Sequence, residues 1–226
     1  GAEPLAGAAV AIADGRIVAV DDAAELRAEH PGAEHRRLDR HLLLPGLVNA
    51  HGHLAMSLFR GLAADRPLME WLTQVIWPLE GRWVDAEFVA DGARLACAEM
   101  IRRGTTTFSD MYFFPEVTAA VASAAGLRAQ LTFPVFDMPN RWAGGADECI
   151  DIGLRLADEY RHDPRIGVVF GPHSTYATDR SHLARIATLA AEIDAAVHVH
   201  CHESADELVQ NAERHGARPL EVLDDC

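Results

Sequence analysis

Short apolar runs alternate with longer amphipathic segments along most of the chain. The short runs, several of them rich in β-branched residues, predict buried strands, and the longer segments repeat apolar residues at helical spacing. The predicted strands are 47–50, 105–109, 127–133, 165–170 and 196–201. The predicted helices are 68–76, 86–103, 117–125, 147–161, 179–193 and 205–215, and a further helix begins at 220. This alternation indicates an α/β fold with a parallel sheet.

Proline and glycine residues mark where several of these elements end. We expect the helix 68–76 to end near Pro78 and the strand 127–133 to end at Pro134, because proline interrupts both kinds of hydrogen-bond ladder. Gly104, Gly126 and Gly216 follow predicted helices, at the position where glycine caps a helix.

The first 45 residues show a different pattern. Residues 8–13 and 16–20 flank an Asp-Gly pair, which predicts a β-hairpin with a tight turn. A short helix at 23–29 and a short strand at 42–44 are expected to follow. So small a β-rich unit is not stable alone. We therefore predict two domains, with residues 1–45 forming part of a β-rich domain and 46–226 forming the α/β domain.

Two α/β architectures fit this pattern, a doubly wound open sheet and a (β/α)8 barrel. The glycine-rich phosphate-binding motifs of nucleotide-binding sheets are absent from the sequence. Polar residues instead follow nearly every predicted strand: His51, His53, Asp110, Tyr112, Asp137, His173, His200 and Glu203. Functional residues at several strand ends favour a barrel. Since only about five strand–helix units are present, we expect a TIM-like barrel that is truncated.

Composition excludes several classes of protein. The chain has 226 residues, is 49% hydrophobic and carries a formal net charge of −14, so nothing favours binding to nucleic acid or to an anionic membrane. It has no apolar run long enough for a membrane span and no features of a secretory signal. Its four cysteines lack CxxC spacing, which predicts reduced thiols in the cytoplasm.

All twenty basic residues are arginine. The absence of lysine excludes a P-loop lysine, a Schiff-base lysine and a carboxylated lysine that bridges two metal ions.

The strongest chemical signal is the pair His51 and His53, which directly follows the strand 47–50. Side chains two residues apart on a strand point to the same side, so these imidazoles can converge on one point. Two converging imidazoles suit zinc or a similar divalent metal ion. Gly52 between them lets the backbone approach a ligand closely. The alternative interpretation is a pair of surface histidines.

A second histidine cluster lies at the end of the strand 196–201. By strand alternation His198, His200 and His202 share one face. Not all three can bind a metal together with the first pair, because zinc has four or five ligand positions. His198 is expected to be a buried histidine or a partner of a ligand, and His202 is left open. His200 with Glu203 offers one ligand and one proton shuttle.

The motifs together resemble those of the amidohydrolase superfamily, and in particular the 5′-methylthioadenosine/S-adenosylhomocysteine deaminases. The resemblance extends along essentially the whole chain, and neighbouring branches include the s-triazine hydrolases. The motifs that carry it are residues 45–53, 56–63, 71–72, 77–80, 104–112 and 171–174 and the His200-x-x-Glu203 pair.

The resemblance implies a distorted (β/α)8 barrel and a small β-sandwich built from both chain ends, with residues 1–45 as its N-terminal part. It implies that His51, His53 and His200 bind one divalent metal ion and that Glu203 shuttles protons. Zinc is expected, with Fe²⁺ or Mn²⁺ as alternatives. Further implied roles are ribose binding by Glu80, nucleoside contact by His173 and lining of the pocket by Trp71. For Glu80 and Trp71 an exposed helix-end acid and a core aromatic are the alternatives.

The implied reaction is hydrolytic deamination of adenine nucleosides, such as 5′-methylthioadenosine and S-adenosylhomocysteine, to the inosine analogue and ammonia. The alternatives are a related aminohydrolase or chlorohydrolase acting on guanine or an s-triazine, or an inactive truncated barrel. The family's site also needs a histidine after strand six and an aspartate after strand eight, which we expect beyond Cys226. We therefore do not expect turnover by this chain alone. The expected partner is a small nucleoside, and a homo-oligomer is left open.

Overall fold

The computed structural model describes residues 3–63 and 65–226. The chain divides into two compact units, residues 1–44 and 45–226, which are described separately.

The first unit is a β-hairpin followed by a helix. Strands β1 (Ala8–Ala13) and β2 (Arg16–Asp22) pair antiparallel, as predicted. The turn residues Asp14 and Gly15 both have positive φ angles, 51° and 71°, which suits a tight hairpin turn. Helix α1 (Ala23–Glu29) begins after Asp22, whose side chain accepts hydrogen bonds from two backbone N–H groups of the first turn.

The prediction of a strand at 42–44 is wrong, because these residues are irregular in the described structure. The leucines at 42, 43 and 44 are 67%, 63% and 63% exposed. With no strand beside them among the described residues, their apolar character alone cannot produce a β-ladder.

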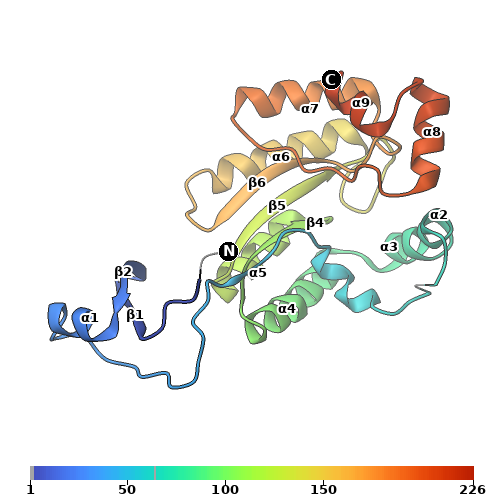
Figure 1. The fold of residues 1–226 in the computed structure, drawn as a ribbon. Coiled ribbons are helices and arrows are strands. Elements are labelled where there is room, and N and C mark those ends of the chain that lie inside the picture. The colour runs from blue at the N-terminus through green and yellow to red at the C-terminus, as the bar shows by residue number, and fades with distance from the viewer. Residues whose placement is uncertain (1–2, 64) are drawn as a thin grey trace. The chain divides into compact units, whose positions relative to one another are not determined.

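The second unit is built on a four-stranded parallel sheet, as predicted (Figure 1). Its strands β3 (Leu47–Asn49), β4 (Thr105–Met111), β5 (Arg128–Val135) and β6 (Ile166–Pro172) follow one another in chain order. Parallel strands added in one direction through right-handed crossovers place their connecting helices on one face. The carboxyl ends of all four strands therefore meet at one edge of the sheet.

Helical segments connect and follow these strands. They are the 3₁₀ helix Leu54–Phe59, α2 (Leu68–Trp71), the π-helical turn Leu72–Ile76, α3 (Trp77–Trp83), α4 (Ala86–Arg102), α5 (Pro115–Ala125), α6 (Ala146–Tyr160), α7 (Arg180–Glu192), α8 (Ala205–His215) and α9 (Pro219–Asp224). The predicted helices agree with these segments within a few residues, apart from the first. In the described part of the chain, none of these helices combines the length and the apolar character that crossing a membrane requires.

Both expectations about proline as an end point are wrong. The helical path continues past Pro78 to Trp83, because the wider π turn Leu72–Ile76 precedes the proline and Pro78 lies in the first turn of α3. Strand β5 continues through Pro134, which pairs with Gly171 of β6, and ends at Val135.

The strand predicted at 196–201 is only partly formed. This segment makes two isolated parallel bridges, Val197 with Phe170 and His200 with Ser174. Backbone hydrogen bonds from Phe170 N to Ala196 O (3.1 Å) and from His200 N to His173 O (3.1 Å) hold it beside β6. Because it pairs on one side only among the described residues, its ladder is not continuous.

The two faces of the sheet differ in polarity. Phe108, Leu131 and Phe133 are fully buried in the apolar core between the sheet and its helices. Strand alternation places Gln130 and Thr132 on the opposite face. That second face therefore presents polar groups beneath the strand ends.

Gly92 controls the packing of α4 against the segment that follows His53. A Cβ atom at Gly92 would lie 2.5 Å from the backbone oxygen of Ala55 and 2.7 Å from its Cα atom. Because backbone atoms cannot rotate away, we expect Gly92→Ala to destabilise the protein by about 1–3 kcal/mol. The measurement is the free energy of unfolding of the intact protein in urea.

Gly81→Ala is the matched control, since Gly81 lies in helix α3 and a Cβ atom there meets nothing within 4 Å. It should be neutral or stabilise by about 0.5–1 kcal/mol. Equal effects of the two substitutions would contradict the packing argument.

Candidate metal and active site

The loop that carries His51 and His53 directly follows β3 and is held by the end of β4. The backbone N–H of Met111 donates to Gly52 O at 3.0 Å. The Asn49 side chain accepts from the His51 N–H at 3.4 Å. These bonds fix the backbone on both sides of Gly52, so the two imidazoles project from a defined position.

Asp110 also anchors this loop. Its Oδ1 accepts a hydrogen bond of 2.6 Å from the backbone N–H of Leu54, directly after His53. The side chain is 2% exposed, and this burial raises the pKa of Asp110 to about 7. A strand-end aspartate is expected from the sequence to fix a loop, and the structure shows Asp110 in this role.

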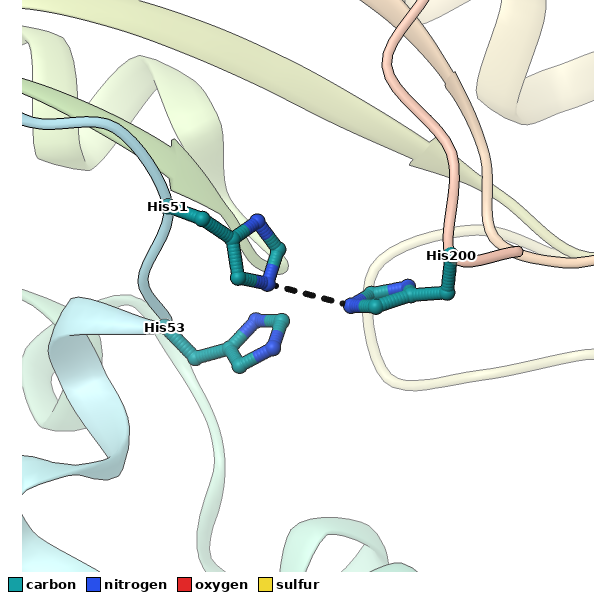
Figure 2. Close-up of side chains that lie close together, drawn as sticks. All are labelled: His51, His53 and His200. Carbon is teal, nitrogen blue, oxygen red and sulfur yellow. Dashed lines mark hydrogen bonds between the residues drawn. The ribbon is translucent and has the colours of Figure 1, made fainter. Parts of the chain in front are cut away.

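The imidazoles of His51, His53 and His200 meet at the carboxyl edge of the sheet. Figure 2 shows the three rings pointing toward one another from two separate segments of the chain. One nitrogen atom from each ring lies within 4.8 Å of the others. The Nε2 atoms of His51 and His200 are 3.2 Å apart. The structure thus brings together the three residues that the sequence singled out as metal ligands.

Backbone carbonyl groups orient two of these rings. His53 Nδ1 lies 2.6 Å from Met111 O, and His200 Nδ1 lies 3.0 Å from His173 O. A carbonyl oxygen only accepts, so Nδ1 carries the proton in both rings and Nε2 keeps its lone pair. This is the arrangement that orients histidine ligands in metal sites.

The environment lowers the pKa of His53 and of His51, which favours their neutral forms. The pKa of His53 is lowered to about 4, mainly by burial; the hydrogen bond to Met111 opposes the shift, and the neighbouring histidines add to it. Burial, followed by the proximity of His200 and His198, also lowers the pKa of His51. A neutral imidazole has the lone pair that a metal ion requires, whereas a protonated one does not.

The donor set fits a small divalent metal ion. Two imidazole nitrogens bound at about 2.0–2.1 Å to one tetrahedral zinc ion are about 3.3–3.4 Å apart. The distance of 3.2 Å between His51 Nε2 and His200 Nε2 is close to this value. His51, His53 and His200 could therefore hold one ion, and imidazole ligands suit zinc, iron and several other metals.

His198 contacts the ring of His51, and His202 does not lie on the same face of its segment as His198 and His200. His198 Nε2 lies 3.1 Å from His51 Nδ1, in accord with the expectation of a partner to a ligand. His202 has a positive φ of 58°, is exposed, and lies with its Nε2 3.4 Å from the backbone N of Leu220. The expectation that His198, His200 and His202 share one face is wrong for His202, because the chain leaves the extended conformation there.

Glu203 lies beside Tyr176. Its Oε2 accepts a hydrogen bond of 3.2 Å from the Tyr176 hydroxyl. The backbone N–H of Glu203 donates to Oε2 of the buried Glu207 at 2.6 Å. Among the described residues, no hydrogen bond joins the Glu203 carboxylate to the three imidazoles. No sequence signal pointed to Tyr176, because this contact depends on how the loops after β6 and before α8 meet. The contact with Glu207 is local, since Glu207 lies four residues further on, in the first turn of α8.

His173 forms a link between the cluster and an aromatic surface. Its ring stacks on Phe136 with centroids 4.5 Å apart and lies 4.7 Å from the ring of His200. Burial lowers the pKa of His173 well below its usual value, so this ring is also neutral. A neutral imidazole beside a phenyl ring can both donate and accept a hydrogen bond.

Glu80 and Tyr112 form a half-buried pair. The Tyr112 hydroxyl donates to Glu80 Oε1 at 2.8 Å. Burial raises the pKa of Glu80 to about 7, and the hydrogen bond from Tyr112 opposes this shift. Trp71, at the end of α2, donates from its indole nitrogen to Leu62 O at 2.9 Å. The structure therefore gives Glu80 a partner that the sequence did not indicate.

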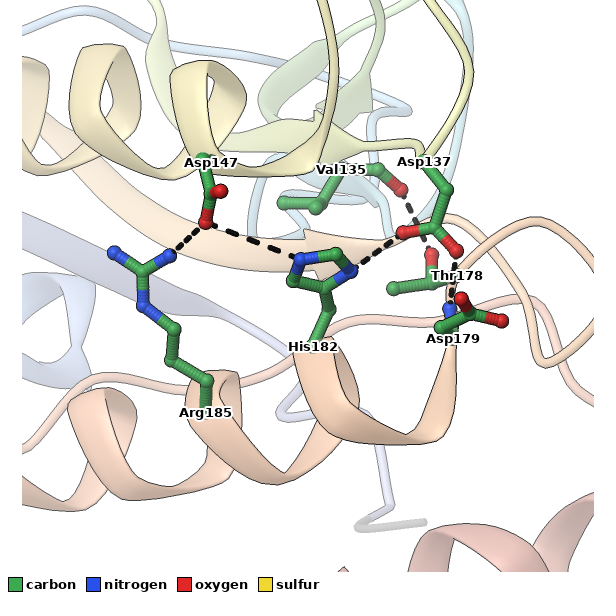
Figure 3. A network of polar contacts seen from close by, with 7 residues as sticks. All are labelled: Val135, Asp137, Asp147, Thr178, Asp179, His182 and Arg185. Atoms are coloured by element: carbon green, nitrogen blue, oxygen red, sulfur yellow. Dashed lines mark hydrogen bonds and ion pairs between the residues drawn. The ribbon is translucent and has the colours of Figure 1, made fainter.

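A polar network joins the loops that follow β5 and β6 (Figure 3). Asp137 accepts hydrogen bonds of 2.6 Å from the backbone N–H of Asp179 and from His182 Nδ1. Asp147 pairs with Arg185 and lies 3.9 Å from His182 Nε2. The strand-end residue Asp137 thus ties the loop after β5 to the start of α7, next to the loop that carries His173 and Tyr176.

A parallel sheet with three imidazoles converging at its carboxyl edge defines an α/β protein with a candidate metal site. The model of the amidohydrolase family matches residues 42–226. The chain belongs to the amidohydrolase family. Residues 8–33 match the model of the imidazolonepropionase-like composite domain of bacteria.

Curated relatives carry the name 5-methylthioadenosine/S-adenosylhomocysteine deaminase. The relative from Saccharophagus degradans is 48% identical over 96% of this chain and 49% of its own length. The relative from Teredinibacter turnerae is 50% identical over 81% of this chain and 42% of its own length. The chain spans about half the length of these relatives.

Solved structures have the same fold. An adenosine deaminase from Xanthomonas campestris with bound zinc matches 98% of this chain and 50% of its own, with a TM-score of 0.89 and 40% identity. A guanine deaminase from C. acetobutylicum matches 96% of this chain and 54% of its own, with a TM-score of 0.86 and 17% identity, which shows likeness of fold alone.

The raised pKa of Glu80 predicts a pH-dependent effect of Glu80→Gln. Between its ordinary pKa of 4.5 and about 7, the folded protein holds more protons at this site than the unfolded chain. Wild-type stability from this group therefore falls as pH rises through that window. The variant lacks this loss. Its free energy of unfolding, relative to that of the wild type, should therefore rise by about 1–3 kcal/mol between pH 4.5 and pH 8. Urea denaturation of the intact protein across this range measures the difference.

Tyr112→Phe provides the companion variant. It removes the donor that favours the carboxylate form of Glu80, so it should enlarge the wild-type loss with rising pH. The double variant should show the same pH dependence of its free energy of unfolding as Glu80→Gln alone. A difference between Glu80→Gln and wild type that does not change with pH would contradict the burial argument.

Proposed function

We propose that this chain supplies a large part of the active site of a metal-dependent deaminase of adenine nucleosides. The substrates proposed are 5′-methylthioadenosine and S-adenosylhomocysteine, following the names of the curated relatives at 48% and 50% identity. The observation that carries the proposal is the convergence of the His51, His53 and His200 imidazoles, two of them oriented by backbone carbonyls. That arrangement prepares a metal site at the edge of the sheet where α/β enzymes of the barrel type carry their chemistry.

We further propose that the parallel sheet is part of a distorted (β/α)8 barrel and that the β1–β2 hairpin contributes to a small β-sandwich. The likeness to the zinc-containing deaminase from Xanthomonas campestris supports the barrel, at a TM-score of 0.89. Since the chain spans about half of its relatives, the remaining strands, a further site histidine and a further site aspartate are proposed to lie outside it.

Zinc is the proposed metal ion, because the three proposed ligands are imidazoles and a related structure holds zinc. When bound, zinc supplies a Lewis acid that lets water act as a nucleophile near neutral pH. Iron and manganese are compatible with the same ligands.

Each remaining side chain has a proposed part in the reaction. Water adds at C6 of the purine, and the exocyclic amino group leaves as ammonia. Glu203 would protonate the ring nitrogen next to C6, take up a proton from the hydroxyl group that water leaves on C6, and pass a proton to the leaving amine. The other proton of the water would go to the further site aspartate proposed outside this chain. The hydrogen bond from Tyr176 would hold the Glu203 carboxylate in place.

The substrate would be held by three further side chains. Glu80 would accept hydrogen bonds from the ribose hydroxyls, His173 would contact the nucleoside, and Trp71 would line the pocket. The stacking of His173 on Phe136 gives this contact a fixed orientation. A location in the reducing cytoplasm is also proposed, since the cysteines at 97, 149, 201 and 226 are free thiols in the described structure.

The intact protein should release ammonia from 5′-methylthioadenosine and S-adenosylhomocysteine and form the inosine analogues. A panel with guanine and an s-triazine separates this reaction from those of related hydrolases. Turnover of those two compounds alone, or of nothing despite bound zinc, would overturn the proposed substrate class.

Two histidine variants test the metal site within this experiment. His200→Ala should lose bound zinc and activity together, because it removes one of three imidazole ligands. His202→Asn alters an exposed histidine two residues away, and asparagine tolerates its positive φ. The control should retain both zinc and activity, and the readout is zinc content by atomic absorption.

Glu203→Gln should separate chemistry from metal binding. Glutamine keeps the shape of the side chain but cannot carry a proton, so activity should fall by about 10²–10⁴-fold while zinc content stays unchanged. Steady-state kinetics on 5′-methylthioadenosine measures the loss. A variant with full activity would exclude Glu203 as the proton shuttle.

A further inference from the structure

One ligand of the candidate metal site differs from the other two in what holds its ring. Nδ1 of His53 and Nδ1 of His200 each face a backbone carbonyl oxygen, at 2.6 Å and 3.0 Å. Nδ1 of His51 instead faces the Nε2 atom of His198 at 3.1 Å, with the two rings nearly perpendicular at 79°. Unlike a carbonyl, an imidazole nitrogen can donate or accept, so this contact alone does not decide which nitrogen of His51 carries the proton.

On its other side, His198 contacts side chains on the polar face of the sheet. His198 Nδ1 lies 3.1 Å from the Thr132 hydroxyl and 3.4 Å from the Ser109 hydroxyl. Gln130 donates from its side-chain nitrogen to the Ser109 oxygen at 3.1 Å. Thr132 is fully buried and Ser109 is 6% exposed, so bulk water does not replace these partners.

These side chains can form their hydrogen bonds in either of two directions. In one, His51 Nδ1–H donates to His198 Nε2, and His198 Nδ1–H donates to the hydroxyl of Thr132 or Ser109. In the other, a hydroxyl donates to His198 Nδ1, and His198 Nε2–H donates to His51 Nδ1. Only the first leaves a lone pair on His51 Nε2, the atom that lies 3.2 Å from His200 Nε2.

We infer that His198 is a positioning residue that accepts the Nδ1 proton of His51 and so presents His51 Nε2 to the metal ion. Thr132 and Ser109 complete the arrangement by accepting the proton on His198 Nδ1. The inference rests on the proposed function only in taking His51 as a ligand. It gives the third ligand the orienting partner that backbone carbonyls provide for the other two.

Three substitutions at His198 separate hydrogen bonding from packing. Phenylalanine keeps a ring of similar size but has no acceptor. Asparagine keeps polar atoms near the Nδ1 position and cannot reach His51. Glutamine places an amide oxygen near the Nε2 position, where it can accept from His51 Nδ1–H.

The measurement is the dissociation constant for zinc, obtained by chelator competition on the intact protein. His198→Phe and His198→Asn should weaken zinc binding by about 10–100-fold, the usual effect of losing such a partner. His198→Gln should bind zinc nearly as tightly as the unsubstituted protein. Melting of each metal-free variant shows that it is folded, and His202→Asn serves as the control for a histidine change in the same segment.

Nitrogen-15 NMR of histidine in the zinc-loaded protein gives a second readout that a purely structural role would not move. His51 should carry its proton on Nδ1, bonded to His198. Unchanged zinc affinity in His198→Phe, or equal weakening in all three folded variants, would overturn the inference. If either result is found while the unsubstituted protein binds zinc and deaminates nucleosides, the role of His198 is wrong and the proposed function stands. A protein that binds none of zinc, iron and manganese overturns both.

Discussion

Two hydrogen bonds from imidazoles to backbone carbonyls determine the geometry of the candidate site. Met111 O lies 2.6 Å from His53 Nδ1, and His173 O lies 3.0 Å from His200 Nδ1. Both carbonyls belong to residues at the carboxyl ends of parallel strands, so their positions follow from strand register. The backbone at that edge therefore orients His53 and His200, while the ring of His51 contacts the side chain of His198.

Buried ionisable groups surround this cluster at a cost to stability. Burial lowers the pKa of His53 to about 4 and raises that of Asp110 and of Glu80 to about 7. Each shift means that the charged form is disfavoured where water is excluded. Asp110 anchors the backbone next to His53, and Glu80 pairs with Tyr112. The lowered pKa of His53 favours the form of the imidazole that can bind a metal ion, since a proton then competes less for its lone pair.

Polar groups on the face of the sheet that carries Gln130 and Thr132 continue from the candidate metal ligands. His198 Nε2 lies 3.1 Å from His51 Nδ1, and His198 Nδ1 lies 3.1 Å from the Thr132 hydroxyl and 3.4 Å from the Ser109 hydroxyl. On the outer side, Asp137 and His182 tie the loops after β5 and β6 together. The scaffold thus fixes both the ligands and the loops that would surround a substrate, and rigid support of this kind is what precise catalysis requires.

The sequence by itself determined the parallel α/β pattern, most helix positions and the three candidate ligands, because hydrophobic period and strand-end spacing are local signals. It could not place His202, which leaves the strand face at a φ of 58°. It also could not reveal that Tyr112 and Tyr176 are the partners of Glu80 and Glu203, or that His51 is the candidate ligand that His198 contacts. These contacts join segments 27 to 147 residues apart, so only the register of strands and the packing of loops decided them.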